Sequence, residues 1–395
     1  MIYLEKSNLL LRITSKFKEN KGRIFNRFFS TYVFRFCYRV FTILPINGKK
    51  ILFASDSRTK MEGNFRFVFD ELQRQNKDFT YRYMLKEGTA AKKTCKEILE
   101  LSYHLATSKY ILLDDFYPMV YPLKIREGAE LIQLWHAVGA FKKFGFSRVG
   151  LPGGPEPDSL NHKNYTKAIV SSKNVAKHYA EGFGIEESKV IATGIPRTDL
   201  FFNQDYKTNK SNQLYEQYPF LKDKKVILFA PTFRGPGQQS AYYPLEYLNL
   251  DKIYQAFHEK YLFLFKIHPF VKVKWKIPPE YRSFFYDFSF YSEINDLLLI
   301  TDLLITDYSS VCFEFALLDK PMIFYAPDME EYTSERDFYY DYESFIPGPM
   351  VTTEEELIKT IKNGHFEVNK LNEFRKYFFD ELDGKSSERV VRLLK

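Results

Sequence analysis

Two histidines follow apolar runs that predict strands, and both have side chains that can act on a reacting oxygen. His136 follows residues 131–135, and His268 follows residues 262–267. An unperturbed histidine has a pKa near 6.5, so at neutral pH the ring of His136 can accept a proton from a hydroxyl. His268 precedes Pro269, which cannot continue an interior strand, and a histidine there can stabilise a diphosphate and its departing oxygen. Taken alone, His136 is better explained as a histidine that packs or caps at a strand end.

Residues 303–318 predict a buried strand that leads directly into a helix. The strand covers 303–306, and the helix begins at Ser309 and Ser310. The unpaired backbone N–H groups and positive dipole end of such a start attract anions, so we expect a phosphate or diphosphate site here. Glu314 lies one turn further on and is placed to bind a ribose hydroxyl. Most strand-to-helix junctions in α/β proteins bind nothing, so this junction gains weight only from the residues at other strand ends.

Four cations in other predicted loops are candidates for anion binding. Arg234 shares a loop with Thr232 after a predicted strand and suits bidentate phosphate recognition. A structural salt bridge is the competing interpretation of Arg234. Arg197 lies in a turn marked by Gly and Pro, and it is either a phosphate ligand or part of the first turn of a helix. Lys142 and Lys143 follow the first histidine closely and are candidate contacts of an acceptor or a phosphate.

Short apolar runs alternate with helical patterns from Lys50 onward, which is typical of parallel sheets with crossover helices. Strands are predicted at 51–55, 80–85, 110–114, 131–135, 168–171, 190–193, 226–230, 262–267, 303–306 and 321–325. The polar stretch 203–225 is rich in Asn, Lys and Gln, and we expect a low-order linker there. The prediction is an α/β protein with two Rossmann-like, doubly wound domains, 50–220 and 221–395, that face each other across a cleft.

The overall composition excludes several classes of protein. At 395 residues and 45% hydrophobic content, the chain is long enough for two globular domains. Its three cysteines are widely spaced without a CxxC pair, which argues against a zinc site or disulfides and fits a reducing cytoplasm. Asp302 and Asp307 match no metal-ligand spacing, so no metal or other cofactor is identified, and a divalent-cation requirement stays open. No uncharged apolar run reaches the roughly 18 residues that a bilayer requires.

Positive charge is concentrated at the N-terminus. Residues 1–50 hold eleven Lys and Arg against two Asp and Glu, a net +9, so the other 345 residues carry −2 of the total +7. A nucleic-acid binder more often spreads cations over its folded surface, so we expect no nucleic-acid partner. Residues 24–46 predict a helix with arginines on one narrow face and Phe, Val and Leu elsewhere, which suits an anionic membrane surface. The alternative is that this appendage, residues 1–49, packs on the protein's own body.

Five motifs in order along the chain resemble those of the CDP-glycerol glycerophosphotransferases of wall teichoic acid synthesis. They are Trp135-His136, the turn 193–199 with Arg197, the loop 230–234, His268-Pro269, and the junction 306–310 with Glu314. The resemblance implies a GT-B architecture, peripheral attachment to the cytoplasmic face of the bacterial membrane, and a CDP-glycerol or CDP-ribitol donor. It implies that His136 is the base, with His268 as the second catalytic residue. The implied donor contacts are Arg234, Thr232, Ser309 and Ser310 for the phosphates and Glu314 and Pro269 for the nucleotide.

The expected reaction is attack of an acceptor hydroxyl, deprotonated by His136, on the phosphorus that bears the alditol, with release of CMP. The acceptor is expected to be a lipid-linked saccharide or a polyol-phosphate chain of teichoic acid or capsule synthesis. One alternative is a nucleotide-sugar glycosyltransferase or epimerase of the same architecture, because a fold does not determine the donor. Another alternative is a non-catalytic scaffold at the membrane surface. Three questions are left open: whether the donor carries glycerol or ribitol, whether the protein is a primase or a polymerase, and which oligomeric state it has.

Overall fold

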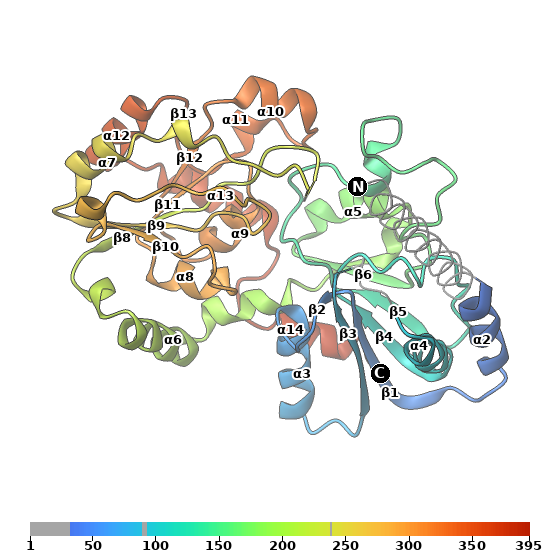
Figure 1. Ribbon diagram of the computed structural model, residues 1–395. Coiled ribbons are helices and arrows are strands. Elements are labelled where there is room, and N and C mark those ends of the chain that lie inside the picture. Colours follow the sequence, from blue (N-terminus) through green and yellow to red (C-terminus); the bar gives the residue numbers. More distant parts are fainter. Residues whose placement is uncertain (1–31, 89–92, 238) are drawn as a thin grey trace, which may run out of the picture.

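The protein has two lobes that lie side by side, each built on its own β-sheet (Figure 1). The computed structural model describes residues 32–88, 93–237 and 239–395. In both lobes neighbouring strands of the main sheet run parallel, and most of the crossover segments between them contain helices. This arrangement confirms the prediction of two Rossmann-like α/β units.

The N-terminal lobe contains a seven-stranded sheet with strand order β2-β3-β1-β4-β5-β6-β7. Its strands are β1 (Asn47–Ser55), β2 (Ser57–Arg58), β3 (Thr80–Glu87), β4 (Ser108–Leu113), β5 (Glu130–Gln133), β6 (Lys167–Val170) and β7 (Val190–Ala192). Among the strands that the structure describes here, only β2 pairs antiparallel, at the edge beside β3. In β1, Ile51 and Phe53 pack into one hydrophobic core, whereas Leu52 and Ala54 pack into another. Because both faces of the sheet are covered, residues 51–54 of β1 form a continuous apolar run.

Among the described residues, the helices that accompany this first sheet include α2 (Phe34–Phe41), α3 (Asn64–Arg74), α4 (Cys95–Thr107) and α5 (Lys173–Phe183). Helix α4 begins with a capping box, in which the Thr94 hydroxyl accepts from the Glu97 amide and the Glu97 carboxylate accepts from the Thr94 amide. Helix α5 ends at Gly184, whose φ of +63° is the left-handed conformation that glycine adopts at low cost.

The C-terminal lobe contains a six-stranded parallel sheet with strand order β10-β9-β8-β11-β12-β13. Its strands are β8 (Lys225–Phe229), β9 (Tyr261–Phe265), β10 (Phe285–Asp287), β11 (Leu303–Thr306), β12 (Met322–Tyr325) and β13 (Met350–Val351). Its helices are α7 (Leu250–Phe257), α8 (Ile294–Ile300), α9 (Val311–Ala316), α10 (Met329–Glu335), α11 (Tyr342–Phe345), α12 (Glu354–Asn363) and α13 (Val368–Phe378). Strand β11 has the predicted bounds, and β8 begins one residue before its prediction.

Helix α6 (Gln204–Gln217) occupies the stretch that was predicted to be a low-order linker, so that prediction is wrong. The side chain of Asn203 caps the helix by accepting from the Tyr206 amide at 2.9 Å. Leu214 is the one buried side chain of α6, so the helix is polar nearly all round, as in helices that bridge domains, and shows no apolar period in the sequence.

The last helix, α14 (Ser386–Arg392), follows the elements of the C-terminal lobe in the chain but packs against α3 of the N-terminal lobe. The strands of the two sheets fall on either side of residue 220. This distribution supports the division into domains 50–220 and 221–395 as a proposal, with α14 as a segment of the second that returns to the first.

Helix α2 lies within the predicted N-terminal helix 24–46, of which residues 24–31 are outside the described residues. Its buried side chains are Phe34 and Tyr38, and it packs on α4. Its opposite face leaves Phe36 67% exposed, and the turn that follows leaves Ile43 84% exposed. Within the part of the chain that the structure describes, no helix is long and apolar enough to span a membrane.

Candidate active site

A cavity of about 340 Å³ is lined by residues of both lobes, at the carboxyl ends of their strands. The N-terminal lobe contributes His136 and Lys142. The C-terminal lobe contributes four further residues that the sequence had singled out: Thr232, His268, Ser309 and Ser310. The fold therefore brings six predicted site residues together, and their roles remain predictions.

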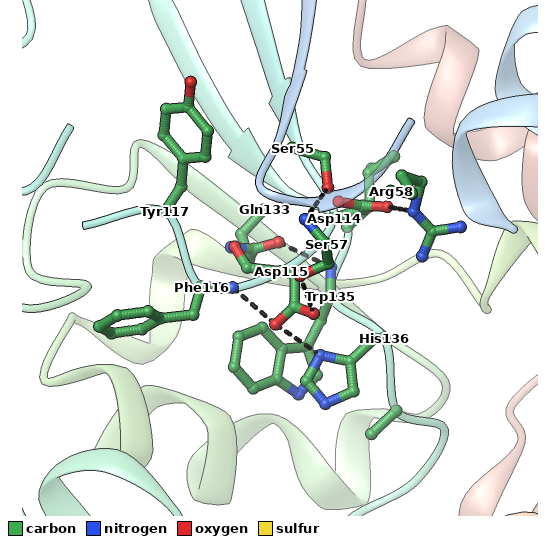
Figure 2. Close-up of polar contacts among 12 residues, drawn as sticks. Ser55, Ser57, Arg58, Asp114, Asp115, Phe116, Tyr117, Gln133, Trp135 and His136 are labelled. Carbon is green, nitrogen blue, oxygen red and sulfur yellow. Dashed lines mark hydrogen bonds and ion pairs between the residues drawn. The ribbon is translucent and has the colours of Figure 1, made fainter. Parts of the chain in front are cut away.

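His136 is paired with a carboxylate that the sequence analysis did not single out (Figure 2). Its Nδ1 lies 3.0 Å from Oδ1 of Asp115. The same Oδ1 accepts from the Phe116 amide, and Oδ2 accepts from the Ser57 hydroxyl, each at 2.7 Å. Burial raises the pKa of Asp115, but His136 and these donors outweigh it and lower the pKa to about 2. Asp115 is therefore ionised at neutral pH. It holds the imidazole by Nδ1, which leaves Nε2 for the cavity.

A local signal for Asp115 exists in the sequence. Asp114 and Asp115 directly follow β4, and β4 pairs with β5, which leads to His136. Adjacent parallel strands end at the same edge of a sheet, so a carboxylate after one and a histidine after the other are neighbours. Asp114 is buried and forms an ion pair with Arg58, so the two adjacent carboxylates have different partners (Figure 2).

The chain makes a strained turn immediately before His136. Trp135 has a φ of +56°, a left-handed conformation that costs a non-glycine residue about 1–3 kcal/mol. The Gln133 side-chain oxygen accepts from the Trp135 amide at 2.9 Å, and the Asn64 side chain donates to the Trp135 carbonyl at 2.8 Å. The indole ring also lies against the His136 imidazole, with a centroid separation of 4.4 Å. These contacts hold the turn that presents the histidine to the cavity.

The loop that follows His136 is anchored on the opposite lobe. The Lys143 amide donates to the Asp337 carbonyl at 2.8 Å, and the Tyr339 amide donates to the Phe141 carbonyl at 2.9 Å. Gly139 has a φ of +66°, and a Cβ added there would lie 2.2 Å from the Phe313 ring of α9. Only glycine allows this close approach, so the loop carries Lys142 across to the C-terminal lobe.

His268 has surroundings quite unlike those of His136. Its Nδ1 accepts from the Phe270 amide at 3.2 Å, so the neutral ring carries its proton on Nε2. Burial lowers the pKa of His268 to about 4, and the positive charges of Lys142 and Lys266 add to this effect. At neutral pH the ring is therefore an uncharged N–H donor, and we expect it to stabilise an anion by hydrogen bonding.

Lys142 reaches the C-terminal wall of the cavity. Its amino group donates to the Tyr332 hydroxyl at 2.8 Å and to the Thr232 hydroxyl at 3.4 Å. Burial lowers the pKa of Lys142 to about 7, against the opposing effect of Asp307. A diphosphate that enters the cavity would raise this pKa and favour the charged amine. Lys143, by contrast, is not among the residues that line the cavity.

Arg234 is buried in an ion-pair network and does not line the cavity. Its Nη1 donates to Asp307 at 2.9 Å, and its Nη2 donates to Asp328 at 2.8 Å. Burial alone would lower the pKa of Arg234, but these carboxylates raise it well above its usual range. The contacts are those of the competing interpretation, a structural salt bridge. Asp307 also accepts the Thr232 amide at 2.7 Å, so the network fixes Thr232 at the cavity.

The strand-to-helix junction supplies hydroxyls to the cavity, although its helix is shorter than predicted. Helix α9 has six residues, with Ser310 at its N-cap position and no side-chain cap. Ser309 accepts from the Val311 amide at 3.4 Å. Because the helix dipole grows with the number of aligned peptides, we expect the hydroxyls of Ser309 and Ser310 to contribute more to anion binding than the helix end.

Arg197 and Glu314 form an ion pair that joins the two lobes. Arg197 lies in the first turn of the 3₁₀ helix η4 (Pro196–Phe202) and also donates to the His136 carbonyl at 2.7 Å. Neither residue lines the cavity, nor does Pro269, which is exposed. The buried Oε2 of Glu314 has no hydrogen-bond partner among the described residues. Across residues 32–88, 93–237 and 239–395, no three His, Cys, Asp or Glu side chains gather as a metal site.

Comparison with known sequences decides the family. Residues 36–395 match the sequence model of the CDP-Glycerol:Poly(glycerophosphate) glycerophosphotransferase family. The chain belongs to this family. The five motifs had predicted this glycerophosphotransferase family, and that prediction is confirmed.

Relatives within the glycerophosphotransferase family include proteins of teichoic acid synthesis. The teichoic acid poly(ribitol-phosphate) polymerase of Bacillus spizizenii is 58% identical over 94% of this chain. The ribitol-phosphate polymerase TarK of Staphylococcus aureus is 46% identical over 92% of this chain. The chain spans 60% and 71% of the lengths of these two relatives, respectively. A ribitol-phosphate primase of B. spizizenii is 38% identical and is covered over 94% of its length.

The fold of the chain also matches that of a solved structure. The wall teichoic acid polymerase TagF aligns with a TM-score of 0.75 over 98% of this chain and 97% of that one, at 22% identity. The two-lobed GT-B architecture that the motifs implied is therefore confirmed.

Proposed function

We propose that this protein transfers an alditol phosphate from a CDP-alditol to a hydroxyl of a teichoic acid acceptor and releases CMP. The observation that carries the proposal is that His136, oriented by Asp115, shares one cavity with the hydroxyls of Thr232, Ser309 and Ser310. An oriented base on one wall and anion-binding groups on the other suit transfer of a phosphoryl group to a hydroxyl. Membership of the glycerophosphotransferase family supports the class of donor.

In the proposed step, the acceptor hydroxyl gives its proton to Nε2 of His136 while its oxygen attacks the phosphorus that bears the alditol. A new P–O bond forms, and the bond from that phosphorus to the oxygen bridging the two phosphates breaks. The bridging oxygen leaves with CMP and carries the negative charge. His268, through its Nε2–H, and the Lys142 ammonium stabilise the charge on the phosphate oxygens.

The remaining predicted site residues do not line the cavity, and each has a separate proposed role. Arg234 acts through Asp307, which holds Thr232 in place. Glu314 keeps its proposed contact with the donor ribose through the unpartnered Oε2. The segment at Pro269 is proposed to contact the nucleotide, and Lys143 to contact the acceptor. We propose no metal ligand.

We propose CDP-ribitol as the preferred donor over CDP-glycerol. The support is that the relatives with 58% and 46% identity are both ribitol-phosphate polymerases, whereas a glycerol-phosphate primase of Bacillus subtilis is only 31% identical. Purified protein should be incubated with CDP-ribitol, CDP-glycerol and UDP-N-acetylglucosamine, each with a polyol-phosphate acceptor. The expected result is CMP release and a lengthened acceptor with CDP-ribitol, and a slower reaction with CDP-glycerol.

The same experiment separates the alternatives. Release of UDP would identify a nucleotide-sugar enzyme of the same fold. No product from any donor would favour a non-catalytic scaffold. Sizing of the lengthened acceptor distinguishes addition of one unit from addition of many.

We propose that α2 and the turn after it attach the protein peripherally to the cytoplasmic face of the membrane, where a lipid-linked acceptor resides. Phe36 and Ile43 are exposed beside Arg39, which gives an apolar surface with positive charge. A face of this kind binds anionic lipid headgroups and buries its apolar side chains in the interface.

Vesicle co-sedimentation tests this attachment. The double variant Phe36→Ser/Ile43→Ser should pellet less with phosphatidylglycerol vesicles than the unaltered protein. A matched control is Val273→Ser/Phe290→Ser, which removes two side chains that are 70% and 68% exposed on the other lobe. Equal loss of pelleting in both double variants would argue against α2 as the attachment site.

A further inference from the structure

One guanidinium connects the loop that follows β5 and carries His136, here called the base loop, with helix α9 of the C-terminal lobe. Nη1 of Arg197 donates to the His136 carbonyl at 2.7 Å, and Nη2 pairs with Oε1 of Glu314. The two paired side chains are only 17% and 6% exposed, so solvent screens this pair far less than a surface salt bridge. Helix α9 follows Ser309 and Ser310, which line the cavity.

The carbonyl that Arg197 binds belongs to the strained turn. Three successive carbonyls at the end of β5 each receive a side-chain N–H: the Asn64 amide donates to Leu134 at 3.3 Å and Trp135 at 2.8 Å, and Arg197 donates to His136. Asn64 also accepts from the Arg197 backbone amide at 3.0 Å. Asn64 and Arg197 thus form one unit that offsets the cost of the left-handed Trp135.

We infer that Arg197 is a positioning residue for the proposed transfer, one that places His136 against the donor-binding wall. The inference rests on the proposed function and adds a role that the predicted phosphate contact did not include. The planar fork of arginine donates in two directions at fixed geometry, which the single ammonium of lysine cannot reproduce. The position of the base is therefore tied to the position of α9.

Glu314 is the second half of this connection. Its Oε1 is bound by Arg197, and its buried Oε2 has no partner among the described residues. A donor hydroxyl that reached Oε2 would hold the carboxylate in the rotamer that pairs with Arg197. Donor binding would then reinforce the connection from α9 through Glu314 and Arg197 to the loop that carries His136.

Steady-state kinetics of Arg197→Lys test the inference, with CMP release as the assay. Because a base displaced by about 1 Å costs on the order of 10²-fold in rate, we expect kcat to fall by about that factor while the donor KM changes about twofold or less. Glu314→Gln should lower kcat similarly, and the double variant should be no slower than the slower single variant, because both changes break one connection.

Arg389→Lys is the matched control. Arg389 also joins a strand-end carbonyl, that of Thr193 at 2.7 Å, to a carboxylate, Asp383 at 2.9 Å, and it makes no contact with the base loop. Its kcat should stay within about threefold of the unaltered protein, an effect of about 0.7 kcal/mol. In addition, Arg197→Ala should regain part of its lost kcat with millimolar guanidinium, whereas Arg389→Ala should show no such recovery.

Several outcomes would overturn the inference. A kcat for Arg197→Lys equal to that of the control, or a loss confined to donor KM, would remove Arg197 from base positioning. If Arg197→Lys does not fold, as judged by its thermal unfolding, Glu314→Gln carries the same test. Failure of the unaltered protein to release CMP from any CDP-alditol would instead reject the proposed function, so the two failures are distinguishable.

Discussion

His136 and His268 line the same cavity from equivalent positions, because each follows a parallel strand of its own lobe. His136 is paired with the ionised carboxylate of Asp115 through Nδ1, and its side chain is 47% exposed. His268 is more buried, accepts a backbone amide at Nδ1, and is influenced by Lys142 and Lys266. One ring is arranged to take up a proton, and the other is held neutral as a hydrogen-bond donor.

This difference shows that position after a strand brings a histidine to the cavity but does not determine its chemistry. A carboxylate beside the ring stabilises the imidazolium that forms when a proton is accepted. Two ammonium groups and a low-polarity environment disfavour it. The two walls of the cleft are therefore specialised as a base wall and an anion-binding wall.

The largest expected effect comes from removing the base. Since general base catalysis contributes about 10²–10⁴-fold, His136→Ala should lower kcat by about 10³-fold. Calorimetric binding of the CDP-alditol should remain within about threefold, because the donor is held mainly by the opposite wall. His365→Ala, which alters an exposed histidine, is the control and should leave kcat unchanged. Unaltered turnover in His136→Ala would place the base elsewhere.

Asp115→Asn should give the next largest loss. The amide has a similar shape but cannot carry the charge that stabilises the imidazolium, and its NH₂ group favours the wrong tautomer of His136. We expect kcat to fall by about 10²-fold with donor KM little changed. Asp70→Asn, at an exposed carboxylate of α3, is the control. A rate near that of the control would mean that the pair with Asp115 is not needed for catalysis.

His268 variants address the anion-binding wall. Because a hydrogen bond to a charged group contributes about 1.5–3 kcal/mol, His268→Ala should raise the donor KM by about tenfold or more and also lower kcat. His268→Gln retains an N–H donor and should recover part of the loss. If both variants bind donor as tightly as the unaltered protein, His268 does not contact the diphosphate.

The smallest effect concerns protonation and is seen by NMR of the imidazole carbons. His268 should stay neutral from pH 7 down to pH 5 and titrate near its pKa of about 4. Between about pH 6.5 and 4 the unfolded chain binds this proton and the folded chain does not, so the stability of the fold should decline as the pH falls through that window. Inorganic phosphate should raise the pKa of His268. Titration near 6.5 without a ligand would contradict the assigned surroundings.

Much of the fold and part of the site were predictable from the sequence. Strand β11 was predicted with its observed bounds, because its three apolar residues and Thr306 are all buried. His136 and Ser309 were expected at the carboxyl ends of strands in opposite lobes, and both line the cavity between them. Helix α6 was missed, because a helix with one buried side chain has no apolar period.

Only the tertiary structure decided which partner each charged side chain has. Arg234 meets Asp307, 73 residues away, and Arg197 meets Glu314, 117 residues away, so two expected phosphate ligands are bound to carboxylates. Asp115 meets His136 because β4 lies beside β5 in the sheet. Apolar periodicity and turn residues report burial and chain direction within a few residues. The partner of a charged group depends on strand order and lobe contact, which bring distant segments together.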